Sequence, residues 1–287
     1  FTNNIALSKG LVNLEYKLDF NNDWSIDYSN LDKVYQANKH LYPIKALIFS
    51  NPQEPTGKVY QRKDIEKVIE FCHANKICFI SWEVGWNSIL NKEQSDNFLP
   101  AAKVLQDMPT KIREELVMFS IYGLTRGIPN MSSLRTGVCY HHNLDKFVNT
   151  QLLKYKSIDI CSSVIGQIAF DLVFSQNLKE RFGEEFQKKY QSGITSIKNR
   201  LTSDKDKVIK ILKDNPHNYY SVNDIQSGIN LFTRLDALNS NVFIEKYYKE
   251  QKTNQYLVSP GKQYGTNRED FINILVNPDA DYNFLNI

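Results

Sequence analysis

The chain has 287 residues, of which 41% are hydrophobic and 23% are charged, and its formal net charge is +3. This composition is ordinary for a globular protein, and the length suffices for one large domain and a smaller one. The low net charge argues against a nucleic-acid-binding surface, and no apolar run approaches the roughly 20 residues that a membrane-spanning helix needs.

The cysteines lie in apolar sequence contexts and show no spacing typical of metal ligands. The chain contains four of them, Cys72, Cys78, Cys139 and Cys161. Free cysteine in such a context is usually buried. We therefore expect reduced core residues and no metal site. Reduced cysteines also indicate a reducing intracellular compartment, either the cytoplasm or the mitochondrial matrix.

Strand-like and helical patterns alternate in the first half of the chain. Residues 62–76 have helical spacing, which places Ile65, Val68, Ile69 and Cys72 on one face. This alternation predicts an open, largely parallel sheet covered by helices, in which ligands bind beyond the carboxyl ends of the strands. The predicted strands are residues 11–20, 44–50, 77–84, 115–123 and 133–142.

The pattern becomes helical from about Leu144. A long amphipathic stretch follows, and it is broken near Gly183. A small α+β domain is predicted after it, with strands and one helix at residues 228–236, 241–251, 256–260 and 271–276. We therefore expect three parts, namely a partial large domain, connecting helices and a small C-terminal domain, at residues 1–175, 176–215 and 216–287.

Three predicted strand ends carry the most specific sequences. They are NPQEPTG at residues 51–57, WEVGW at residues 82–86, and a stretch in which Arg135 follows Arg126 by nine residues. Together with YKLDFNNDWSIDYSNLDK, SSVIGQIAFD and SPGKQYG, they resemble the fold-type-I pyridoxal-phosphate aminotransferases, and most closely the alanine aminotransferase branch.

This resemblance covers residues 15–174 and 228–276, and it implies an α/β fold. The large domain would have three layers, α/β/α, around a mostly parallel sheet, and a smaller α+β domain would follow it. In the family, the glycine-rich phosphate loop and the aromatic residue stacked on the pyridine ring come before the segment that resembles residues 11–19, and we expect that portion to be missing from this chain. The resemblance therefore implies a partner: a homodimer, a larger protein complex, or a separate chain that supplies the missing N-terminal part.

The resemblance also assigns residues to the catalytic positions of the family. Transamination needs a neutral lysine amine that forms an imine with the cofactor, and a carboxylate beside the pyridine nitrogen. The lysine position holds Arg126, whose guanidinium stays protonated and cannot form an imine. The carboxylate position holds Trp82, whose indole carries no charge.

Other cofactor contacts of the family are replaced as well. The two residues that contact the cofactor ring oxygen, a tyrosine and an asparagine, correspond to Gly85 and Glu54. A serine that donates to the phosphate corresponds to Gly123, and the arginine for the substrate carboxylate corresponds to Ile272 or Asn273. These replacements predict that the site no longer binds its cofactor.

Arg135 is the one charged phosphate contact that the resemblance retains. An alternative role for it is an ion pair with Glu83 or Glu54. For the emptied cofactor slot we expect partial filling by Trp82, with Arg126 paired to Glu54 or Glu83. The alternative is that Trp82 turns outward with Trp86 to form a partner surface.

These residues predict an aminotransferase-like protein without transaminase activity and without a cofactor, acting as a structural or interaction subunit. The alternative is an active pyridoxal-phosphate enzyme of the alanine:2-oxoglutarate type that uses atypical ligands. One half of a split enzyme would fail as a catalyst with this sequence, because the lysine position belongs to the part that is present, but a split scaffold is a further alternative.

Overall fold

The computed structural model describes residues 6, 8–128, 131–158, 163–175, 177–237, 239–250, 258–264, 269–276, 282 and 285. The chain divides into two compact units, Phe1–Lys45 and Ala46–Ile287. No helix in the described ranges has the length and apolarity that crossing a membrane requires. The predicted domain boundaries at residues 175 and 215 stay predictions.

The first unit contains a short antiparallel ribbon and one helix. The ribbon consists of β1 (Leu18–Asp19) and β2 (Ser25–Ile26), and the helix is α2 (Tyr28–Asn38). The expected strand over residues 11–20 is therefore wrong for most of its length. Only its last part finds a hydrogen-bonded partner strand, and without one an alternating sequence has no sheet to join.

The second unit begins with a four-stranded sheet in the order β3-β4-β5-β6. Its strands are β3 (Ala46–Ser50), β4 (Cys78–Trp82), β5 (Met118–Gly123) and β6 (Gly137–His142). The first three run parallel, and β6 runs antiparallel to β5. The predicted largely parallel sheet is confirmed, so the carboxyl ends of three strands meet at one edge.

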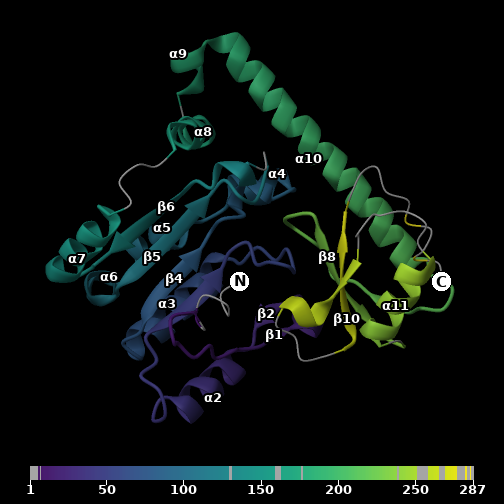
Figure 1. Ribbon diagram of the computed structural model, residues 1–287, viewed down its shortest axis with the longest axis horizontal. Helices are drawn as coiled ribbons and strands as arrows, with labels where there is room; N and C mark the ends of the chain where they lie inside the picture. The colour runs from purple at the N-terminus through teal and green to yellow at the C-terminus, as the bar shows by residue number, and fades with distance from the viewer. Residues whose placement is uncertain are drawn as a thin grey trace. The chain divides into compact units, whose positions relative to one another are not determined.

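Helices pack on one face of this sheet (Figure 1). They are α3 (Arg62–Ala74), α5 (Ala101–Asp107) and α6 (Thr110–Glu115). The predicted apolar face of α3 is confirmed, since Ile65, Val68, Ile69 and Cys72 are fully buried. Strand side chains alternate between the two faces, and the alternate ones, such as Phe79, are buried under this helical layer.

The last strand of this sheet differs from its prediction. Cys139 on β6 is exposed, so its assignment to the core is wrong, and Val138 and Tyr140 are exposed beside it. The physical reason is that β6 is an edge strand of the described sheet, where β5 is its neighbour on one side only. Cys72 is buried and Cys78 partly buried, and Cys161 lies outside the described residues.

A helical segment follows the first sheet, as predicted. Its helices are α7 (Lys146–Lys156), α8 (Val164–Phe174), α9 (Leu178–Phe182) and α10 (Glu184–Lys213). The break at Gly183 is confirmed, because this residue has φ +87° between α9 and α10. A positive φ is a conformation that glycine adopts at little cost.

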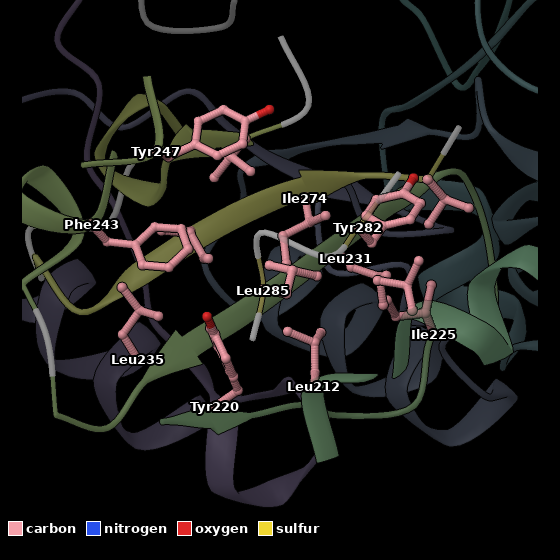
Figure 2. Close-up of a cluster of buried hydrophobic side chains, with 14 residues drawn as sticks. Leu212, Tyr220, Ile225, Leu231, Leu235, Phe243, Tyr247, Ile274, Tyr282 and Leu285 are labelled. Atoms are coloured by element: carbon pink, nitrogen blue, oxygen red, sulfur yellow. The ribbon is translucent and has the colours of Figure 1, made fainter. Parts of the chain in front are cut away.

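A second, antiparallel sheet follows α10, with strand order β7-β8-β10-β9. Its strands are β7 (Tyr220–Ser221), β8 (Asn230–Leu235), β9 (Val258–Pro260) and β10 (Phe271–Leu275), and its helix is α11 (Ser240–Glu250). Side chains from the end of α10, the sheet and α11 form one buried cluster, including Leu212, Leu231, Phe243 and Ile274 (Figure 2). The predicted C-terminal strands and helix are confirmed, with β7 as an added strand.

Hydrogen bonds tie the segment before β8 to the loops of the first sheet. The side-chain oxygen of Gln226 accepts from the backbone N–H of Val59 at 2.8 Å. The backbone carbonyl of Gln226 accepts from the backbone N–H of Leu90 at 3.0 Å. The hydroxyl of Ser227 lies 2.8 Å from that of Ser88. These bonds hold the loops at the carboxyl ends of β3 and β4 in place.

Candidate functional site

The loop after β3 is held by its own side chains and by β4. Asn51 donates its backbone N–H to the carbonyl of Trp82 at 3.0 Å, and its side-chain oxygen accepts from the N–H of Tyr60 at 3.0 Å. Gln53 accepts from the hydroxyl of Thr56 at 2.7 Å. The loop therefore has a fixed path past the end of the neighbouring strand.

Gly57 closes this loop at a position that only glycine fits. Its φ is +70°, and a Cβ added there would lie 2.5 Å from the carbonyl oxygen of Ser227. Any other residue would collide with that backbone. The loop is thus packed against the segment that leads into the C-terminal sheet.

Five of the residues singled out by sequence lie at or just beyond the carboxyl ends of β3, β4 and β5. We call them the strand-end group, and they are Glu54, Trp82, Gly85, Gly123 and Arg126. The carboxylate of Glu54 lies 3.7 Å from Nε of Arg126. Its other oxygen lies 3.6 Å from the point where a Cβ on Gly85 would be. Three members of the group therefore converge on one place.

The expected ion pair between Arg126 and Glu54 is present, but it is solvated. The Arg126 side chain is 59% exposed and that of Glu54 is 37% exposed. Partial burial raises the pKa of the Glu54 carboxyl, and the charge of Arg126 opposes this rise. Exposed ion pairs of this kind contribute about 0–1 kcal/mol, so the pair sets local charge more than it sets stability.

The other two members of the group end their strands. Trp82 is the last residue of β4 and is partly buried, and Trp86 is partly buried with its ring 5.3 Å from that of Phe174. Gly123 is the last residue of β5, where an added Cβ would lie 3.3 Å from a methyl of Val84. Filling of the slot by the Trp82 indole stays a prediction.

Glu83 adjoins the group in sequence but is directed into the interior. It is fully buried, and its carboxylate accepts from the hydroxyl of Ser81 at 2.9 Å and from the N–H of Ala101 at 2.6 Å. Burial raises the pKa of Glu83, although these bonds and Tyr122 favour its ionised form. Burial, together with the neighbouring Glu83 charge, raises the pKa of Tyr122 as well. Glu83 therefore joins the sheet to the start of α5 rather than pairing with an arginine.

Asn87 is a site residue that the sequence did not reveal. It is buried and donates to the carbonyl of Ile128 at 3.1 Å. Gly127 lies against it with φ +93°, and a Cβ there would come within 1.7 Å of its side-chain oxygen. Asn87 thus fixes the backbone directly after Arg126, and nothing in its sequence context signals that role.

The remaining positions that the sequence singled out, Arg135 and the two C-terminal candidates, each have a different environment. Arg135 is exposed with φ +46°, and in the part of the chain that the structure describes it forms no ion pair, so the alternative pairing with Glu83 or Glu54 is absent. Ile272 belongs to the C-terminal core. Asn273 is buried and donates to the Tyr264 hydroxyl at 3.0 Å.

The chemistry available to the strand-end group is limited by its side chains. They supply one carboxyl group, one guanidinium and one indole, and the two glycines supply none. None of these groups is an amine that could attack a carbonyl carbon. Within the described ranges, no cluster of His, Cys, Asp and Glu could hold a metal ion.

Comparison with known proteins identifies relatives of the chain. A family model for aminotransferase class I and II matches residues 1–281. Alanine aminotransferase 2 of Xenopus laevis is 30% identical over 225 residues, which cover 78% of this chain and 40% of that protein. Human alanine aminotransferase 1 is 31% identical over 167 residues, which cover 58% of this chain and 33% of that protein. The chain spans less than half the length of these relatives.

Solved structures agree on the fold. Alanine aminotransferase from Pyrococcus furiosus matches with a TM-score of 0.73 at 16% identity, covering 99% of this chain and 62% of that chain. The PLP-bound C-S lyase from Staphylococcus hominis matches with a TM-score of 0.68 at 14% identity, covering 96% of this chain and 64% of that chain. The fold is therefore the α/β fold of the pyridoxal-phosphate-dependent aminotransferases.

Proposed function

We propose that this chain, which belongs to the class I and II aminotransferase family, has no transaminase activity and acts as a structural or interaction subunit. The observation that carries the proposal is the convergence of Arg126 and Glu54. A guanidinium and a partly desolvated carboxylate meet where the family resemblance calls for an amine and an amide. Family membership establishes the scaffold, while activity depends on the residues of the site.

The residues present do not fit pyridoxal phosphate. Glu54 would bring a carboxylate toward the cofactor's ring oxygen, and two oxygens that carry negative charge repel each other. Trp82 offers the pyridine nitrogen neither a charge nor an acceptor. Arg126 cannot form the covalent bond, because its guanidinium does not deprotonate in proteins. We therefore propose that the chain binds no pyridoxal phosphate.

We also propose that the protein is part of an oligomer or a larger complex. We further propose a reducing compartment, such as the cytoplasm or the mitochondrial matrix. Large apolar side chains are exposed on several elements, which supports a protein partner. The free cysteines Cys72, Cys78 and Cys139 support a reducing environment.

An active enzyme with atypical ligands is the second candidate. The observation that favours it is the match to alanine aminotransferases over most of the chain. It would require another amine to replace the one missing at Arg126.

Reduction by borohydride separates the two candidates. Purified protein would be incubated with pyridoxal phosphate and reduced, with human alanine aminotransferase 1 as the positive control. We expect no pyridoxyl-lysine by mass spectrometry and no cofactor absorbance in the visible range. A stoichiometric adduct on any one lysine would overturn the proposal.

An Arg126→Lys variant extends this experiment. It returns an amine to the end of β5, but it leaves Trp82, Gly85 and Glu54 unchanged. Residues that act as one catalytic unit are not recovered singly. We therefore expect no measurable transfer from alanine to 2-oxoglutarate, and activity restored by this one change would show that the other replacements matter little.

A further inference from the structure

A side-chain hydrogen bond joins α10 to the short helix α4 (Lys92–Asp96), which follows β4. Nζ of Lys198 on α10 donates to the hydroxyl oxygen of Ser95 on α4 at 3.4 Å. The two residues are 103 positions apart in the chain, so the fold brings them together. Most side chains in this part of α10 are exposed, whereas that of Lys198 is partly buried. The Lys198 amine therefore lies against α4.

The Lys198 amine has a hydroxyl as its partner instead of a carboxylate. Across the ranges that the structure describes, no carboxylate oxygen lies within ion-pair distance of this Nζ. The acid beside Ser95 on α4, Asp96, is already held in an ion pair by Lys92. A hydroxyl satisfies an N–H donor but does not balance the charge of an ammonium group. Lys198 is thus a lysine without a counter-charge in contact.

This environment favours the neutral amine. Burial lowers the pKa of the Lys198 amine, the charge of Asp96 opposes this fall, and the like charge of Lys92 adds to it. A neutral amine is the nucleophile in reactions with a carbonyl carbon. Because the side chain is only partly buried, a small reagent can reach it.

Two other lysines of α10 provide an internal comparison. Lys188 and Lys189 each lie 2.8 Å from a carboxylate, that of Glu184 and that of Glu185. Their side chains are 74% and 77% exposed, so they are more accessible than Lys198. Each amine has to release its carboxylate before it can attack a carbonyl carbon. Accessibility therefore favours these two lysines, and the availability of the amine favours Lys198.

We propose that Lys198 is a covalent modification site, which accepts an acyl group from an acyl phosphate. The lone pair of Nζ attacks the carbonyl carbon, and the bond between this carbon and the phosphate oxygen breaks. Inorganic phosphate leaves with the electron pair of that bond, the proton of the amine passes to water, and an amide remains. The positive charge of Lys92 acts on the same place, which favours a donor with an anionic leaving group.

The modification would act on the contact between α10 and α4. An amide carries no charge, and the added acyl group enlarges the side chain beside Ser95. The inference goes beyond the proposed role as a structural subunit, because it assigns a reactive group that this role does not require.

Trace acetylation of the full chain tests the proposal. The chain would receive a limiting amount of acetyl phosphate, and peptide mass spectrometry would compare Lys198 with Lys188 and Lys189 in the same molecules. We expect Lys198 to react about two- to fivefold faster, which is the difference that an exposed ion pair makes to the two control lysines. The Lys198→Arg variant should lack this product and leave the other two rates unchanged.

Two variants of α4 should change the rate at Lys198 in opposite directions. Asp96→Asn removes the acid that opposes the fall in the pKa of Lys198, so acetylation should become faster. Lys92→Met removes the like charge and frees Asp96 to pair with Lys198, so acetylation should slow to the rate of Lys188. Both positions are exposed, and circular dichroism would verify that the variants are folded.

A rate at Lys198 no higher than that at Lys188 would overturn the proposal. Variants of α4 that change all these lysines alike, or that change Lys198 in the reverse directions, would overturn it as well. Equal selectivity for a neutral acetyl thioester would refute the acyl phosphate as the donor. The borohydride experiment repeated on Lys198→Arg keeps the two proposals apart. A pyridoxyl-lysine that persists in that variant bears on the loss of transaminase activity and leaves the acylation of Lys198 untouched.

Discussion

Helices α3 and α8 have similar lengths, 13 and 11 residues, and both carry branched aliphatic side chains. In α3 the large side chains Ile65 and Ile69 are fully buried against the first sheet. In α8 the large side chains Ile165 and Ile168 face solvent, and small residues make the contact with the sheet's loops. The chain thus buries the large side chains of α3 within its own core, whereas it leaves those of α8 exposed.

The largest expected effect is on the free energy of unfolding when a buried residue of α3 is truncated. Ile69→Ala should lower the free energy of unfolding by about 2–5 kcal/mol, because it removes a fully buried side chain and leaves a cavity. Ile168→Ala, its counterpart on α8, should change it by less than about 0.5 kcal/mol, as at other exposed positions. Denaturant unfolding at a protein concentration low enough to keep the chain monomeric measures both.

Equal losses in the two variants would contradict the comparison. They would mean that Ile168 is buried within the chain and that its exposed position on α8 is wrong. An unchanged midpoint for Ile69→Ala would in turn mean that α3 does not belong to the cooperative core.

Periodicity predicted α3 well because a helix packed on one side displays its buried face in the sequence. It could not predict the orientation of α8, because Val164, Ile165 and Ile168 would suit a core as well as an interface. The prediction that Cys139 is a core residue was wrong for a related reason. An apolar run indicates a strand, but only the strand order shows that β6 lies at an edge of the described sheet, where Cys139 is exposed.

The candidate site was predictable in part. The motif resemblance located Glu54, Gly85 and Arg126, and the parallel strands bring them together since their carboxyl ends share one edge. The resemblance did not reveal that Glu83 would be directed to the start of α5, nor that Asn87 would fix the backbone after Arg126. Both depend on three-dimensional contacts between residues far apart in the chain.

A medium effect is expected at Trp82, which is the last residue of β4. A buried tryptophan truncation costs about 3–5 kcal/mol, and Trp82 is only partly buried. Trp82→Ala should therefore lower the free energy of unfolding by about 2 kcal/mol, through lost packing at the strand ends. Denaturant unfolding tests this, with Trp82→Phe as the control that keeps an aromatic ring. An unchanged midpoint for Trp82→Ala would show that the indole fills nothing.

The smallest effect concerns Glu54 and Arg126, and it appears as a dependence on pH. Partial burial raises the pKa of Glu54 in the folded chain, while in the unfolded chain it keeps the ordinary value of about 4.3. Below that pH both states are protonated, and the full stability is present. As the pH rises, the unfolded state loses its proton first, so stability is lost until the pH exceeds the folded-state pKa.

Glu54→Gln removes this titration, so its stability relative to wild type should increase from pH 4 upward and then level off. The total change should stay under about 1 kcal/mol, since the side chain is 37% exposed and water screens its charge. Arg126→Ala removes a charge that lowers the pKa of Glu54, so in that variant the loss of stability should extend to higher pH. Unfolding curves collected from pH 4 to pH 8 for the three proteins provide the measurement. Parallel profiles for wild type and Glu54→Gln would mean that Glu54 titrates alike in the folded and unfolded chains, and that burial does not raise its pKa.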